Sequence, residues 1–71
     1  MTLADSFRRF RQEYGLTQQQ VANALNIHKS AYQRYEGGKI IPAATIIINL
    51  ADAFNVSADY LLGRTDNPQV A

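Results

Sequence analysis

The chain has 71 residues, of which 46% are hydrophobic and 18% are charged, the composition of a single small globular domain. It contains no cysteine and only one histidine, which excludes a disulfide framework and a thiolate zinc site. The net charge of +1 is too small to indicate a partner. The longest apolar run, residues 46–48, is far too short to cross a membrane, and the N-terminus lacks a signal-peptide pattern, so we expect a cytoplasmic protein.

A first helix is predicted from about residue 3 to residue 14. Its apolar residues recur at helical spacing and therefore share one face: Leu3, Phe7, Phe10 and Tyr14. Thr2 and Asp5 suit an N-terminal cap, and Gly15 suits the end of the helix. Leu16, the next hydrophobic residue, would then pack back against the helix that Gly15 terminates.

Two shorter helices follow, separated by a tight turn. Thr17 and Gln20 form the Thr-x-x-Gln pattern of a capping box. An apolar stripe at helical spacing comes next, consisting of Val21, Ala22 and Leu25. Asn26 tolerates the left-handed conformation that ends such a helix, and the next helix runs from about residue 28 or 29 to Glu36, before the glycines at 37–38. Two helices joined by so short a turn form a helix-turn-helix, whose second helix can enter the major groove of DNA.

Two further helices are predicted downstream. Pro42 fits the start of the fourth, over residues 43–54, whose inner face would carry Ile47, Leu50, Ala51 and Phe54. Ser57 is a good N-cap for a short fifth helix over residues 58–62. Because no segment alternates with period two, we expect an all-α, compact five-helix domain. Residues 64–71 are polar and aperiodic, which predicts a frayed tail or the start of a linker.

An ordered set of residues resembles the phage-repressor and Cro-type helix-turn-helix DNA-binding domains, also known from bacterial regulators of the xenobiotic-response-element type. The matching positions are Gly15–Gln18, Val21, Ala22, Leu25, Ile27, Arg34–Glu36, Gly38, Pro42, Leu50, Ala51, Val56 and Tyr60–Gly63. The resemblance covers residues 3–63. It implies a lambda-repressor-like domain over residues 1–63, with a polar C-terminal tail over residues 64–71.

The outer face of the second motif helix carries the candidate base-reading residues Lys29, Ser30, Gln33 and Arg34. Glutamine can bond bidentately to adenine, and lysine or arginine to guanine. The resemblance implies the same four positions. The alternative is a polar helix face that is merely solvated. Tyr32, on the expected inner face, is larger than the aliphatic residue usual there, so it needs extra core space or a partner for its hydroxyl.

Candidates for phosphate contact flank this face. Gln18 follows the Thr17 cap, so its side chain and the free backbone N–H groups of the helix start can point at one phosphate. Lys39 and His28 are further candidates, although His28 replaces the serine or threonine that usually caps the reading helix, which puts that cap in doubt. The resemblance also implies a structural ion pair between Arg11 and Glu36.

Charge and hydrophobicity are distributed unevenly along the chain. Residues 8–39 contain six basic residues against two acidic ones, a balance that suits an electrostatic footprint for phosphate. The isoleucines at 40, 41 and 46–48 exceed what one helix face buries. The family pattern turns Ile47 and Ile48 inward and Ile46 outward, and several exposed isoleucines would indicate a homodimer contact.

The resulting hypothesis is a sequence-specific DNA-binding transcriptional regulator, a bacterial or phage repressor. Two copies would bind a pseudo-palindromic double-stranded operator with recognition helices about 34 Å apart. An antitoxin with the same fold and a protein-interaction module without DNA binding remain as alternatives. We expect no catalytic residues, metal, cofactor, small-molecule ligand or membrane attachment. Either the protein responds to its own concentration, or the chain is the DNA-binding piece of a longer protein.

Overall fold

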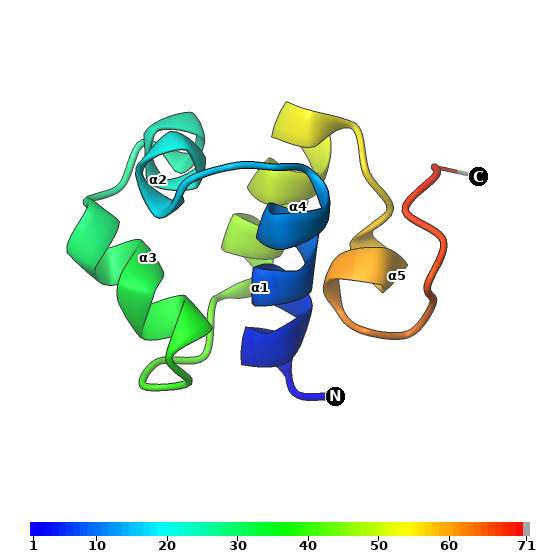
Figure 1. Ribbon diagram of the computed structural model, residues 1–71, viewed down its shortest axis with the longest axis horizontal. Coiled ribbons are helices and arrows are strands. Elements are labelled where there is room, and N and C mark those ends of the chain that lie inside the picture. The colour runs from blue at the N-terminus through cyan, green and yellow to red at the C-terminus, as the bar shows by residue number, and fades with distance from the viewer. Residues whose placement is uncertain (71) are drawn as a thin grey trace.

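The computed structural model describes residues 1–70, and over that range it contains five helices and no strand. The helices are α1 (Leu3–Glu13), α2 (Gln18–Leu25), α3 (Lys29–Glu36), α4 (Ala44–Phe54) and α5 (Ala58–Leu61). Helices α1 and α4 lie at the centre, α2 and α3 on one side, and α5 on the other (Figure 1). The predicted all-α, five-helix fold is confirmed. No helix within residues 1–70 is long and apolar enough to cross a membrane.

The helix boundaries follow from local side-chain chemistry. The hydroxyls of Thr2 and Thr17 each accept a hydrogen bond from the backbone N–H of the residue three positions later. The side chain of that residue accepts a hydrogen bond from the backbone N–H of the threonine in return, which completes a capping box at each site. Asn26 and Asn55 adopt φ angles of 57° and 53°, the left-handed conformation in which they end α2 and α4. The Ser57 hydroxyl accepts the N–H of Tyr60 at the start of α5.

The core gathers residues from all five helices and from the turn before α5. Its buried members are Phe7, Phe10, Val21, Ala22, Leu25, Tyr32, Leu50, Val56, Tyr60 and Leu61. The ring of Phe7 on α1 stacks against Tyr32 on α3 with a centroid distance of 6.4 Å, and it meets Tyr35 edge-on. This aromatic contact fixes the inner face of α3 against α1, so the opposite face of α3 must point outward.

The isoleucines of α4 differ from the sequence expectation. Ile48 was expected to face inward, but its side chain is 53% exposed. Ile46, which was expected outside, packs together with Ile47 against the core. The reason is helical geometry: Ile48 precedes the buried Leu50 by two positions, about 200° around the helix axis. Residues Ile40 and Ile41 of the α3–α4 connection are also exposed.

The segment after α5 is attached to the domain, where a frayed tail or the start of a linker was expected. The Arg9 guanidinium lies 4.2 Å from the centre of the Tyr60 ring, and it donates hydrogen bonds to the backbone carbonyls of Tyr60 and Thr65. The N–H of Ser57 donates to the carbonyl of Pro68 at 2.8 Å. These contacts hold the chain against α1 and α5 as far as Pro68.

We expect Arg9→Met to lower the free energy of unfolding by about 1–3 kcal/mol, because charge-assisted hydrogen bonds to carbonyls are lost while the apolar stem remains. Chemical denaturation followed by circular dichroism measures the change. Arg64→Met is the control, because the ion pair of Arg64 with Asp59 is exposed on both sides. Equal stability of the two variants would mean that the docked segment contributes nothing.

Candidate nucleic-acid interface

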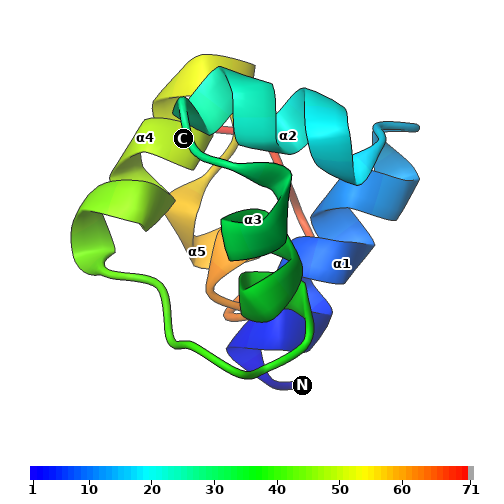
Figure 2. The same ribbon diagram turned by 90° about the vertical axis from the view of Figure 1, so that its left-hand side faces the viewer.

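The four candidate base-reading residues lie together on the outer side of α3. Lys29, Ser30, Gln33 and Arg34 are all exposed, whereas Tyr32 and Glu36 of the same helix are buried. Figure 2 shows α3 at the front of the molecule, with α2 crossing above it and no other element covering it. The helix therefore presents one polar, positively charged face to solvent.

The start of α2 borders the same surface. A shallow hollow of about 460 Å³ lies beside it, lined by Arg11, Leu16, Thr17, Gln18, Gln19 and Lys29. Lys29 thus belongs to the outer side of α3 and also lies beside the N-terminus of α2. Lys39, just beyond α3, is exposed. His28 is also exposed; it occupies the N-cap position of α3 without forming a side-chain cap. That end of the helix therefore lacks the support that a serine or threonine gives.

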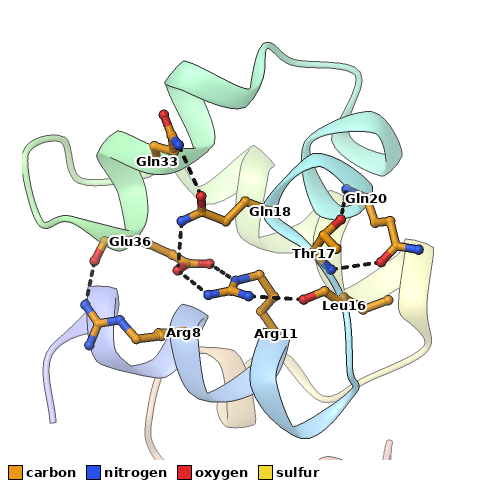
Figure 3. Close-up of polar contacts among 8 residues, drawn as sticks. All are labelled: Arg8, Arg11, Leu16, Thr17, Gln18, Gln20, Gln33 and Glu36. Carbon is orange, nitrogen blue, oxygen red and sulfur yellow. Dashed lines mark hydrogen bonds and ion pairs between the residues drawn. The ribbon is translucent and has the colours of Figure 1, made fainter.

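An ion pair connects α3 to α1 on the protein side of α3, behind the outer face that carries the candidate base-reading residues. Arg11 donates to the two carboxylate oxygens of Glu36 at 2.6 Å from Nε and 3.2 Å from Nη2, and to the carbonyl of Leu16 (Figure 3). The Glu36 side chain is only 4% exposed and that of Arg11 is 20% exposed. Arg8, one turn earlier on α1, donates to the backbone carbonyl of Glu36 at 2.9 Å. Two arginines therefore clamp the C-terminal end of α3.

The ion pair also shapes the charge of the surface. Burial acts to raise the pKa of Glu36, but the hydrogen bonds from Arg11 and Gln18 outweigh it and hold that pKa below 4.5. The hydrogen bond with Glu36 raises the pKa of Arg11 in turn. Because the carboxylate of Glu36 is buried and neutralised locally, it does not offset the exposed charges of Lys29 and Arg34.

Acid should destabilise the protein through Glu36. The pKa of Glu36 is lower in the folded chain than its ordinary value of 4.5, so the stabilisation is complete above pH 4.5 and is lost as the pH falls below it. We expect the midpoint of thermal unfolding to fall between pH 5 and pH 3 by more in the parent chain than in Glu36→Gln, which cannot titrate. Parallel pH profiles for the two proteins would contradict this assignment.

Three hydrogen bonds of this site, two made by Gln18 and one by Arg8, had no counterpart in the sequence analysis. From the sequence, Gln18 was assigned only a phosphate contact. In the structure Gln18 Nε2 donates to Glu36 Oε1 at 3.4 Å, and Gln18 Oε1 accepts from Gln33 Nε2 at 3.2 Å (Figure 3). Arg8 was not assigned a role. The only sequence signal for it is that Arg8 and Arg11 lie three residues apart and therefore on one side of α1.

The sequence indicated two ways to accommodate Tyr32, and the structure shows the first of them, space in the core. Its side chain has core space, being completely buried and stacked on Phe7. Its hydroxyl, however, lies near the Glu36 carboxylate without forming a hydrogen bond of normal geometry. Burial, reinforced by the neighbouring carboxylate, raises the pKa of Tyr32, so the hydroxyl keeps its proton.

The tight turn between α2 and α3, the outward polar face of α3 and the bracing from α1 define a helix-turn-helix protein. The chain belongs to the helix-turn-helix family, whose model matches residues 7–61.

Known relatives agree with this membership. The chain is 39% identical over 61 residues to the uncharacterized HTH-type transcriptional regulator YobD of Bacillus subtilis, covering 86% of this chain and 54% of YobD. It is 32% identical over 71 residues to the cryptic phage CTXphi transcriptional repressor RstR of Vibrio cholerae, covering 97% of this chain and 63% of RstR. The chain thus spans little more than half of each relative.

A solved structure gives the same result for the fold. The crystal structure of a transcriptional regulator from Listeria innocua superposes with a TM-score of 0.78 at 31% sequence identity. The match covers 90% of this chain and 60% of the other. The five-helix arrangement is therefore shared with a solved transcriptional regulator over nearly the whole of this chain.

Proposed function

We propose that the chain is a sequence-specific DNA-binding transcriptional regulator that acts as a repressor, with α3 in the major groove. The main observation behind the proposal is the outward face of α3. Four polar side chains lie together on this face, and the arginines of α1 brace the helix from the protein interior. Lys29 and Ser30 lie at the N-terminal end of α3, the end that contacts base edges in this motif, and Gln33 lies one turn on.

Contacts with phosphates would position the helix. The first turn of α2 has free backbone N–H groups and the positive end of the helix dipole, which suits a phosphate beside Gln18. Lys39 and His28 are exposed at the two ends of α3, where they would contact the DNA backbone on either side of the helix. Relatives named as transcriptional regulators and a repressor support the same function for this chain.

The regulator would act as a homodimer on a pseudo-palindromic operator in the cytoplasm, without catalysis. Two-fold symmetric binding places two recognition helices about 34 Å apart, one turn of DNA. The exposed isoleucines at 40, 41 and 48 supply apolar surface that a second copy could cover.

Salt dependence tests DNA binding against a module that binds only protein. Titrating a fluorescent operator duplex should give a dissociation constant that rises more than about tenfold between roughly 50 and 200 mM salt, because phosphate contacts release counterions. A protein-interaction module would bind no duplex at either salt concentration, which would reject the proposal.

A further inference from the structure

A chain of hydrogen bonds connects the buried ion pair to the outer face of α3. It starts at Arg11, whose Nε lies 2.6 Å from Glu36 Oε2. It continues from Glu36 Oε1 to Gln18 Nε2 over 3.4 Å, and from Gln18 Oε1 to Gln33 Nε2 over 3.2 Å. Figure 3 shows the four side chains leading from α1 through the start of α2 to the exposed surface of α3. The last of them is a candidate base-reading residue.

The order of donors and acceptors along this chain is fixed by chemistry. An ionised carboxylate only accepts hydrogen bonds, so the amide nitrogen of Gln18, and not its oxygen, must face Glu36. The amide oxygen of Gln18 is thereby turned toward Gln33, where it can only accept. Gln33 must therefore donate a hydrogen bond from its own amide N–H to that oxygen. The charge of one buried residue therefore sets the direction of two amides, the second of them at the surface.

We infer that Glu36, acting through Gln18, holds the amide of Gln33 in one orientation and thereby makes Gln33 selective for adenine. This inference rests on the proposed function. Gln33 uses one N–H on Gln18 and keeps its second N–H and its oxygen for DNA. Adenine presents the matching pair in the major groove, the N7 acceptor and the N6 donor, whereas guanine presents two acceptors.

Gln18 and Glu36 are positioning residues in this scheme, since they act on a base only through Gln33. An unrestrained Gln33 amide would be free to turn over and exchange its oxygen and nitrogen, which would reverse the pattern offered to the base edge. Gln18 then has two separable effects. A phosphate contact affects all sequences alike, whereas orientation of Gln33 affects one base pair.

The inference is tested with operators selected by the purified chain and then varied at single base pairs. Gln33→Met should reduce the preference for adenine at one position, by about 5- to 100-fold for a lost bidentate contact. Gln18→Met should reduce the same preference at the same position, besides weakening all sequences. The double variant should show no larger loss of that preference than Gln33→Met alone, because the two residues act as one unit.

Gln19→Met is the matched control. Gln19 is the next residue of α2 and is exposed, and within residues 1–70 its side chain hydrogen-bonds to Asn23 of its own helix alone. It should retain the adenine preference. A readout without DNA is the side-chain amide signal of Gln33 in nuclear magnetic resonance spectra, which should shift in Gln18→Met and stay in place in Gln19→Met.

The outcomes separate this inference from the proposed function. If Gln18→Met weakens all operators equally and leaves the adenine preference intact, the orientation by Gln18 is wrong while DNA binding stands. If Gln33→Met changes no base preference, Gln33 reads nothing and the inference is likewise overturned. If the parent chain selects no sequence at all, the proposed function itself fails.

Discussion

Replacing Arg11 with methionine is expected to lower the free energy of unfolding by about 3–5 kcal/mol, because the change leaves an unpaired carboxylate in the interior. The Glu36 side chain is 4% exposed and would lose the one cationic group that pairs with its carboxylate within residues 1–70. The carbonyl of Leu16 would lose a donor as well. Native domains are stable by only roughly 5–15 kcal/mol, so a domain this small would be close to unfolding. Urea denaturation followed by circular dichroism measures the loss.

The double variant Arg11→Met, Glu36→Leu is the control for this prediction. Removing both charges leaves no unpaired ion, so much of the lost stability should return. A cost below about 1 kcal/mol for Arg11→Met alone would place the pair among ordinary surface ion pairs and would contradict its bracing role.

The second large effect is expected on DNA affinity. Arg34→Glu should weaken operator binding by on the order of 100-fold or more, because a positive group on the reading face is replaced by one that repels phosphate and base acceptors. Arg34 is exposed, so the fold should survive, apart from a loss of at most about 1 kcal/mol at the C-terminal end of α3. Fluorescence anisotropy with a labelled operator gives the affinity.

Arg64→Glu makes the identical charge change on the other side of the molecule. Arg64 follows α5, which lies at the opposite end of the long axis from α3 (Figure 1). At physiological salt the screening length is about 8 Å, so this variant should bind within about threefold of the parent chain. Equal loss of affinity in both variants would mean that net charge, and not the face of α3, governs binding.

The parts of the fold that depend on neighbouring residues were predictable from the sequence. The capping boxes at Thr2 and Thr17 and the left-handed Asn26 involve groups within a few residues of each other, so the helix ends followed directly. The outward face of α3 could be predicted from the helical spacing of its residues, once Tyr32 was assigned to the core. The roles of the exposed residues in reading DNA remain predictions.

The contacts that the sequence could not give join distant positions. The bond from Arg8 to Glu36 spans 28 residues, that from Gln18 to Glu36 spans 18, and that from Arg9 to Thr65 spans 56. Such pairs depend on how helices pack, and no local rule encodes them. The error at Ile48 had another origin, since a family pattern was transferred where the residue lies about 200° from Leu50 around the helix axis.

Selection of bound duplexes from a random library with the purified chain tests DNA reading most directly. We expect one enriched sequence with two related half-sites centred about one helical turn apart, and a different preferred base in Lys29→Ala and in Gln33→Ala. Recovery of no enriched sequence, or of the same preferred sequence from the parent chain and both variants, would contradict the assignment of α3 as the reading helix.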